Sequence, residues 1–312
     1  MQKPFVPIIA GPTASGKTSL SIEIAKRFNG EIVSADSMQI YKSMDIATAK
    51  PDEVEMQGVP HHLIGIIEPD EVFSVAQYKT RAIEAINDII SRGKMPIVVG
   101  GTGFYIDTLM NNTEFLDYEK SDIRAVLEHR NEEEGTLSLL KELSEVDPET
   151  AEKLHINDTK RIIRALEVYY STGKTISEQR ELSHLTESPY NWCLIGLNAD
   201  NRQYLYDRIN LRVDIMLENG LLDEARNFFS SDVSRTAVQA IGYKELKPFL
   251  DGQKSLDDAV EKLKMETRRY AKRQLTWFRR YENINWFMTD RYSKDELINR
   301  VSALIEENRR ML

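Results

Sequence analysis

The feature that most constrains the fold of this chain is a glycine-rich segment close to its start. The segment has the form GxxxxGKT and consists of Gly11, Pro12, Thr13, Ala14, Ser15, Gly16, Lys17 and Thr18. An apolar run of strand length (residues 5–10) precedes it, and apolar residues at helical spacing follow from Lys17. A strand, this loop and a helix in that order form a phosphate-binding loop. Its backbone N–H groups, the helix dipole and the charge of Lys17 bind the anion, and the Thr18 hydroxyl can bind Mg²⁺.

Further strand-like runs alternate with helical periodicity along the chain. The runs span residues 31–36, 62–67, 96–99 and 193–197, and helical spacing covers residues 74–92 and about 201–229. Strands that alternate with helices form a doubly wound parallel sheet. The sequence therefore predicts an α/β protein with a P-loop NTPase-like doubly wound parallel sheet, whose ligands lie at the carboxyl ends of the strands.

The strand signal disappears between Asn111 and about Pro189. This stretch is charged and helical, with Asp147-Pro148 placed to begin one helix and Asn157-Asp158 placed to cap the next. We expect an all-helical insertion subdomain over residues 114–189. Residues 1–113 and 190–312 then form the catalytic core with its C-terminal helices.

Composition and charge narrow the class of protein further. A single cysteine, Cys193, excludes an internal disulfide and a CxxC metal site. No apolar stretch is long enough to cross a bilayer, and the start lacks a signal-peptide pattern, so we expect a cytoplasmic protein. We also expect it to be monomeric. The net charge is −9, yet residues 262–280 hold eight basic residues and one acid, a local charge of +7. This basic stripe on an acidic chain indicates a localised anionic partner.

Two strand ends beside the phosphate loop carry candidate chemistry. Asp36 ends the second run and can be a metal ligand, a general base or merely a helix N-cap. The fourth run ends in Gly100-Gly101-Thr102-Gly103, which is either a tight turn or a place where a ligand approaches the backbone and bonds Thr102. The fourth strand end lacks the acid usual in ATPases and GTPases, and the chain has no Asn-Lys-x-Asp motif.

Five motifs together resemble a known family. They are GPTASGKT at residues 11–18, DSMQIY at 36–41, DIATAKP at 45–51, GGTGFY at 100–105 and RQLTWF at 273–278. The combination resembles bacterial tRNA dimethylallyltransferases, also called tRNA isopentenyltransferases. The motifs occur in the family's order from residue 11 to about residue 280, so the resemblance spans nearly the whole chain.

The resemblance implies transfer of a dimethylallyl group from its diphosphate to the exocyclic amine of the adenine 3′-adjacent to the anticodon. Residues 11–18 would then bind the diphosphate with Mg²⁺. Lys17 and Arg208 match positions that stabilise the leaving group, with Arg212 the less favoured alternative to Arg208. Asp36 matches the family's general base, and Thr102 matches the residue that bonds the target adenine.

The same resemblance implies a set of contacts with the tRNA anticodon stem-loop. Asp36 and Thr102 would belong to this set, and Gln39 would offer the base both a donor and an acceptor. The remaining predicted contacts are Ser37, Met38, Arg124, Lys160, Arg161, Ile162, Ile163, Arg164, Gln239, Lys272 and Arg273. From spacing alone, the basic residues among them are equally compatible with a solvated helix face.

Two other classes of protein remain open at this stage. A P-loop small-molecule or nucleotide kinase shares the phosphate loop, and the helical insertion could serve as its lid. A non-catalytic RNA-binding module could retain a vestigial nucleotide site. A kinase should turn over ATP, whereas a binding module should hold tRNA without altering it.

Overall fold

The computed structural model describes residues 2–115, 122–185 and 187–311. The chain forms two compact units. Met1–Leu109 together with Pro189–Leu312 make the first, here called the core unit, and Met110–Ser188 make the second, the helical unit. Among the described residues, no helix is both long enough and apolar enough to cross a membrane.

The core unit is built on one six-stranded parallel sheet in the order β3-β2-β4-β1-β5-β6. Its strands are β1 (Phe5–Ala10), β2 (Gly30–Ser34), β3 (His61–His62), β4 (Met95–Gly100), β5 (Asn191–Asn198) and β6 (Asn285–Met288). The central strand β1 pairs with β4 on one side and with β5 on the other, so the strand order reverses around it. The predicted parallel α/β sheet is confirmed.

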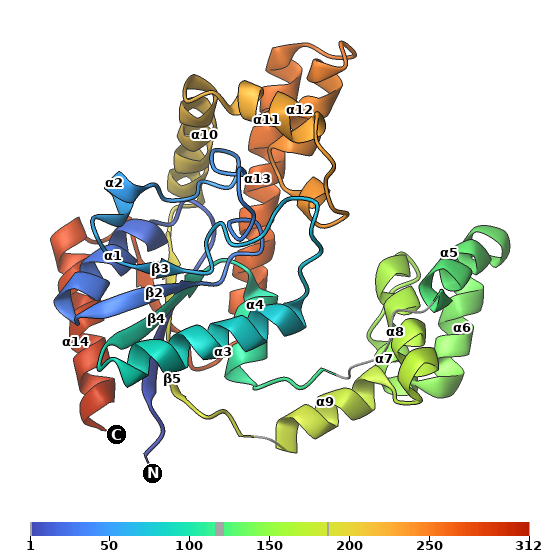
Figure 1. Cartoon of the computed structure of the whole chain (residues 1–312), viewed down its shortest axis with the longest axis horizontal. Coiled ribbons are helices and arrows are strands. Elements are labelled where there is room, and N and C mark those ends of the chain that lie inside the picture. Colours follow the sequence, from blue (N-terminus) through green and yellow to red (C-terminus); the bar gives the residue numbers. More distant parts are fainter. Residues whose placement is uncertain (1, 116–121, 186, 312) are drawn as a thin grey trace. The chain divides into compact units, whose positions relative to one another are not determined.

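Helices cover both faces of the sheet, because side chains of alternate strand residues point to opposite faces. Ile9, Ile97 and Ile195 belong to a buried cluster with residues of α1 (Lys17–Arg27) and α14 (Lys294–Arg310). The opposite face is covered by α3 (Val75–Ser91), which packs against β2 and β4 (Figure 1). A capping box of Ser74 and Gln77 starts α3 where the sequence predicted a helix.

The amino end of β2 carries a buried carboxylate. Glu31 is 2% exposed and accepts hydrogen bonds from Arg92 (2.5 and 2.7 Å) and Lys94 (2.8 Å). It also contacts the Nε2 atom of His62 at 2.7 Å, which ties the edge strand β3 to β2. These partners, chiefly Arg92, hold the pKa of Glu31 well below its usual range.

The third predicted strand is much shorter than residues 62–67, because the backbone leaves the extended conformation directly after His62. Leu63 has φ 63° and Gly65 has φ 59°, both in the left-handed region that interrupts a strand. Only an isolated bridge between Tyr41 and Ile67 continues the pairing. The sixth strand, β6, was not predicted, since its short, aromatic-rich sequence follows a long helix without a strand-length apolar run.

The region after β5 is helical, as expected, but the long helix predicted over about 201–229 is two helices. Gly220 adopts φ 96° and separates α10 (Arg202–Glu218) from α11 (Leu221–Phe229). The chain continues through the 3₁₀ turn η1 (Ala237–Gln239), α12 (Tyr243–Leu250) and α13 (Leu256–Phe278). Helix α13 packs against both α10 and α12. Two shorter helices complete the assignment: α2 (Glu53–Met56) follows β2, and α4 (Gly103–Met110) follows β4 and ends at Met110, the first residue of the helical unit.

All described elements that lie wholly within the helical unit are helices. They are α5 (Ile123–Glu134), α6 (Thr136–Val146), α7 (Pro148–Glu152), α8 (Thr159–Thr172) and α9 (Ile176–Leu185). Asp147 caps α7 by accepting from the Thr150 N–H (3.1 Å), and Pro148 occupies the first turn, as the sequence predicted. This unit has its own core of leucine, isoleucine and alanine side chains.

Candidate active site

The phosphate loop lies between β1 and α1. Gly16 adopts φ 93°, a left-handed conformation that glycine takes without the cost of a Cβ, and the loop turns there into the first residue of α1. Lys17 folds back over the loop, where its Nζ donates to the carbonyl of Pro12 at 2.7 Å. The loop thus presents the helix N-terminus and an ammonium group, the arrangement that binds phosphate groups.

Two arginines of α10 also reach this loop. The Arg208 Nε donates to the carbonyl of Ala14 at 2.8 Å, and an Arg212 Nη1 lies 3.4 Å from the Thr13 hydroxyl. The pKa of Lys17 is lowered to about 7, mainly by burial and next by the charge of Arg212, while the charge of Asp36 acts in the opposite direction. Burial and the charge of Arg208 likewise lower the pKa of Arg212. Three cations therefore crowd around one loop, and a bound polyanion would relieve their repulsion.

The carboxyl ends of β2 and β4 meet beside this loop. A Cβ on Gly100 would lie 2.1 Å from the carbonyl oxygen of Ala35, so only glycine allows the two strand ends to approach this closely. The Thr102 N–H donates to that same carbonyl (3.1 Å), and the Thr102 Oγ1 accepts from the Ser37 N–H (3.0 Å). Asp36 and Thr102, predicted from separate motifs, are thus on adjoining loops of one site.

Asp36 serves both as a local cap and as an available carboxylate. Its Oδ1 accepts from the N–H groups of Met38 (2.9 Å) and Gln39 (3.3 Å), which is the capping role considered from the sequence. Within the described part of the chain, Oδ2 has no hydrogen-bond partner. One oxygen therefore fixes the side chain while the other can accept a proton.

Gln39 is also held in place, which corrects one expectation. Its Nε2 donates to the carbonyls of Thr48 (3.1 Å) and Ala49 (3.0 Å). Both N–H donors of the amide are used in this way, so Gln39 offers a base only the acceptor Oε1 and not a donor as well.

A glutamate that the motifs did not single out stabilises the segment 45–47, which directly precedes the two carbonyls that bind Gln39. Glu224 on α11 accepts from the N–H groups of Asp45 (2.9 Å), Ile46 (2.7 Å) and Ala47 (2.8 Å) and from the Tyr243 hydroxyl (2.9 Å). It therefore fixes the segment whose carbonyls orient Gln39. No sequence signal connects Glu224 with residues 45–47, because the contact joins segments far apart in the chain.

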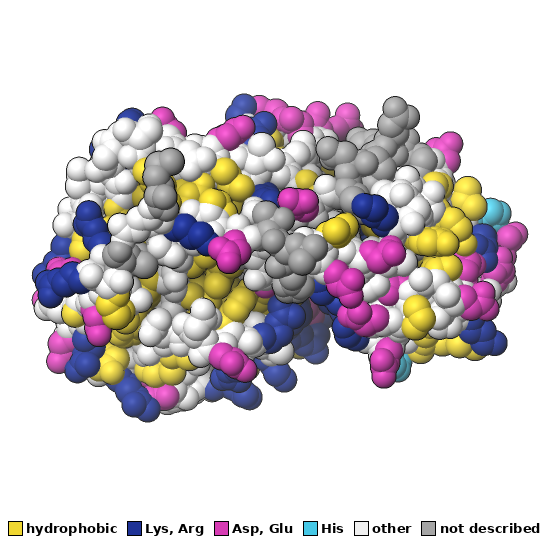
Figure 2. All heavy atoms as spheres, turned by 90° about the horizontal axis from the view of Figure 1, so that it is seen from below, with side chains coloured by type: hydrophobic (Ala, Val, Ile, Leu, Met, Phe, Trp, Pro, Cys, Tyr) yellow, Lys and Arg dark blue, Asp and Glu magenta, His cyan; other side chains and the backbone are white. Residues whose placement is uncertain are grey.

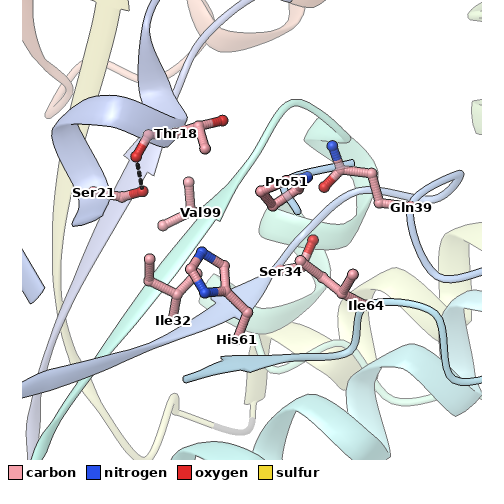
Figure 3. A pocket seen from close by; sticks show the side chains of 9 residues that line it. All are labelled: Thr18, Ser21, Ile32, Ser34, Gln39, Pro51, His61, Ile64 and Val99. Atoms are coloured by element: carbon pink, nitrogen blue, oxygen red, sulfur yellow. Dashed lines mark hydrogen bonds between the residues drawn. The ribbon is translucent and has the colours of Figure 1, made fainter. Parts of the chain in front are cut away.

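A small cavity of about 30 Å³ lies next to the phosphate loop (Figure 3). Its walls combine polar and apolar side chains, namely Thr18, Ser21, Ile32, Ser34, Gln39, Pro51, His61, Ile64 and Val99. Since a water needs roughly 10–15 Å³ by this measure, the space holds about two waters and is too small for a five-carbon chain.

The oxygen groups of the site are compatible with Mg²⁺. No group of three or more His, Cys, Asp or Glu side chains that could hold a metal ion occurs among the described residues. Mg²⁺ usually needs no such cage, since it binds through one or two protein oxygens together with phosphate oxygens and waters. The Thr18 hydroxyl, on the first turn of α1, is an oxygen of this chain that fits that role.

Helix α13 carries a basic surface whose two halves differ. In the first half, Lys262 and Arg269 pair with Glu266 (3.0 and 2.7 Å), and Lys264 pairs with Asp214 (2.7 Å). In the second half the basic side chains are exposed, and no ion pair joins them to an acid within the described residues; they are Lys272, Arg273, Arg279 and Arg280. The predicted contacts Lys272 and Arg273 therefore belong to the half that remains available to an external anion.

The predicted contacts in the helical unit divide by burial. Ile162 and Ile163 are 0% and 3% exposed and pack the core of that unit, so the prediction that their side chains contact tRNA is wrong. Lys160, Arg161 and Arg164 are exposed on α8.

Several cations of the helical unit already have acidic partners. Arg124 on α5 bonds Glu128 (3.0 Å) and Glu167 (3.3 Å), and Arg164 also bonds Glu167 (3.0 Å). On the face in Figure 2, acidic and basic side chains lie side by side over this unit. Gln239 of the core unit is exposed at the end of η1.

A parallel sheet with a phosphate loop after its central strand defines the P-loop class of α/β proteins. A family model described as IPP transferase matches residues 39–281. The chain belongs to the tRNA dimethylallyltransferase family, also called the tRNA isopentenyltransferase family.

Individual relatives agree with this assignment. The chain is 53% identical over 293 residues to a tRNA dimethylallyltransferase of Caldanaerobacter subterraneus, with 93% of each chain covered. It is 46% identical to one of Bacillus cereus, with 98% and 97% covered.

Solved structures show the same fold. The full-length tRNA isopentenylpyrophosphate transferase of Bacillus halodurans matches with TM-score 0.72 and 43% identity over 99% of both chains. A eukaryotic dimethylallyltransferase acting on tRNA matches with TM-score 0.79 and 34% identity, covering 92% of this chain and 74% of that one.

Proposed function

We propose that this protein transfers a dimethylallyl group from dimethylallyl diphosphate to the exocyclic amine of the adenine 3′-adjacent to the anticodon of tRNA. The observation that carries the proposal is the meeting of a three-cation phosphate loop with the adjoining loops of Asp36 and Thr102. The names of its relatives support the same reaction. A phosphoryl-transfer enzyme is not favoured, because the relatives are prenyltransferases.

The geometry accounts for departure of the diphosphate. As the allylic carbon–oxygen bond breaks, negative charge grows on the leaving group in contact with the loop N–H groups and Lys17. Arg208 and Arg212 both reach this loop, so we assign both guanidinium groups to the diphosphate. When bound, Mg²⁺ would neutralise further charge on the diphosphate, held by Thr18.

The acceptor side needs a base and a means of holding the adenine. As the amine nitrogen bonds to the allylic carbon, the nitrogen loses one proton, and Asp36 Oδ2 is the oxygen that takes it. Gln39 Oε1 can accept from the amine, and Thr102 is held beside Asp36 by Ser37. The base must leave the anticodon-loop stack to reach these groups.

We further propose that tRNA lies along the second half of α13 and on the exposed cations of the helical unit. Lys272 and Arg273 offer charge in the core unit, and Lys160 offers it in the helical unit. Arg161 and Arg164 are exposed as well, but they already lie near Asp158 (3.8 Å) and Glu167 (3.0 Å), so a tRNA phosphate would compete with these carboxylates. The phosphate backbone of the anticodon stem-loop is the polyanion that these cations would contact.

The test is mass spectrometry of an unmodified tRNA that has three adenines after the anticodon. The tRNA is incubated with the protein, Mg²⁺ and dimethylallyl diphosphate, and a parallel sample receives ATP instead. We expect a gain of one dimethylallyl group on the first of these adenines, with ATP left intact. Unmodified tRNA with ATP consumed would show a kinase, and tRNA that is bound but unmodified would show a binding module.

A further inference from the structure

One buried side chain connects the two halves of the site. Gln274 on α13 is 5% exposed, and its Oε1 accepts from the N–H of Thr13 in the phosphate loop at 2.9 Å. Its Nε2 donates to the carbonyl of Gly101 at 2.9 Å. An N–H on one side and a carbonyl on the other leave only one orientation of the amide that satisfies both.

Each partner of Gln274 belongs to a loop with a different task. Thr13 is part of the loop that holds the leaving diphosphate, and its hydroxyl lies next to Arg212. Gly101 immediately precedes Thr102, which fixes Ser37 and the loop that carries Asp36. The pairing of β1 with β4 ends at Ala10 and Gly100, and beyond that point the amide group of Gln274 joins the donor loop to the acceptor loop.

The contact between Gln274 and Gly101 is also tight. A Cβ on Gly101 would lie 2.1 Å from Gln274 Nε2. The amide carbon of Gln274 and the Gly11 carbonyl oxygen would each lie 3.3 Å away, so the Nε2 atom is the main obstacle. Gly101 is not among the residues with positive φ, so alanine suits its backbone conformation. Glycine is needed here because the glutamine amide occupies the space.

We propose that Gln274 is a positioning residue that aligns the allylic carbon of the donor with the adenine amine. This inference rests on the proposed function. Displacements of about 1 Å in such an alignment can cost 100-fold in rate, whereas binding of each substrate alone depends on its own loop. Loss of the bridge should therefore lower kcat and leave the affinities for diphosphate and tRNA nearly unchanged.

The first test replaces Gln274 by methionine, which keeps the length but can pair with neither Thr13 nor Gly101. We expect kcat to fall by about 10- to 100-fold, with the Kd values for inorganic diphosphate and tRNA changed by less than about threefold. Gln203→Met is the matched control, because Gln203 is exposed on α10 and its side chain donates to Asp207 (2.7 Å), away from both loops. The control should keep wild-type kcat.

A second variant, Gln274→Glu, adds a readout that a merely structural role would not produce. Its carboxylate can accept from Thr13 but cannot donate to Gly101, so kcat should again be low at pH 8. Burial raises the pKa of a carboxyl group, and the protonated form donates a hydrogen bond. The ratio of variant to wild-type kcat should therefore rise as the pH falls toward 6.

A double-mutant cycle tests the contact itself. Gly101→Ala should lower kcat about as much as Gln274→Ala, because the added methyl group displaces the amide. The double variant should be no worse than Gln274→Ala alone, since the methyl group then fills vacated space.

The outcomes separate this inference from the proposed function. If wild-type protein does not prenylate tRNA, the proposed function is wrong whatever the variants do. If wild-type protein is active and Gln274→Met keeps wild-type kcat, the positioning role is wrong. The role is also overturned if Gln274→Met loses only folded protein, with kcat per folded molecule unchanged, or if single-variant losses in the cycle simply add.

Discussion

Replacing Lys17 by methionine should make the ligand-free protein more stable at low pH. The pKa of Lys17 lies at about 7 in the folded protein, lowered mainly by burial, against an ordinary value of 10.5. Between these two pH values the unfolded chain binds more protons at this group than the folded protein does. The contribution of Lys17 to stability therefore rises with pH across this interval, and its cost is fully present only below pH 7.

The size of the effect follows from the shift of 10.5 − 7 = 3.5 units. At about 1.4 kcal/mol a unit, the cost of the buried charge reaches at most about 5 kcal/mol below pH 7. Partial contact of Lys17 with solvent reduces this cost. The variant also loses the 2.7 Å hydrogen bond to Pro12, and this loss lowers the expected gain in stability by about 1 kcal/mol. We expect a gain in the free energy of unfolding of about 2–3 kcal/mol at pH 6 and nearly none at pH 10.

Urea unfolding at pH 6 and pH 10 measures this difference. Lys272→Met is the matched control, since Lys272 is exposed on α13 and should give little change at either pH. Excess inorganic diphosphate should then stabilise the wild-type protein at pH 6 and the Lys17 variant much less. A variant that is less stable at both pH values, or a gain independent of pH, would refute the reasoning.

Three further predictions concern catalysis, tRNA binding and the fold. Asp36→Asn keeps an oxygen that accepts from the Met38 N–H but removes the base, so kcat should fall by roughly 100- to 10,000-fold in a single-turnover assay. The affinity for tRNA should stay unchanged; normal turnover together with a lost affinity would contradict this role. The double variant Lys272→Ala, Arg273→Ala should reduce the slope of log K for tRNA binding against log salt concentration by about 1.5. The control double variant Lys262→Ala, Arg269→Ala should change this slope less, because both of its cations are paired with Glu266; equal changes in the two double variants would show that the two halves of the basic surface do not differ in tRNA binding. Glu31→Gln removes the buried carboxylate from the partly exposed cations of Arg92 and Lys94, so the free energy of unfolding in urea at pH 7 should fall by about 2 kcal/mol. The loss should be smaller at pH 3, because the contribution of a carboxylate with a lowered pKa declines as the pH falls below its ordinary range; an unchanged stability at pH 7 would contradict the assignment.

Local patterns along the chain predicted the parts of this structure that depend on local physics. The phosphate loop, α3 with its Ser74 cap and the Asp147-Pro148 helix start all follow from short-range spacing and capping chemistry. The third strand was overextended because an apolar run does not reveal the left-handed backbone at Leu63.

The residues that sequence reasoning missed act through long-range contacts. Glu224 bonds Ile46, 178 positions earlier in the chain, and Gln274 bonds Gly101 and Thr13, which lie 173 and 261 positions earlier. Ile162 and Ile163 illustrate the opposite error, since a contiguous motif was assigned to RNA although helical periodicity turns those two side chains into the core. The buried isoleucines and the exposed cations of this motif can be told apart only once the packing of α8 against the other helices of its unit is known.

The pairing of β1 with β5 has a consequence for how the chain folds during synthesis. Phe5 pairs with Asn191, and the whole helical unit lies between them in sequence. Helices with local contacts form quickly, whereas a parallel pairing with so long an intervening segment is slow. On the ribosome the helical unit can therefore become structured while the apolar β1 still lacks a neighbouring strand on one side. The phosphate loop gains its bond to Gln274 only after α13 has emerged, so catalytic competence is among the last properties that the growing chain acquires.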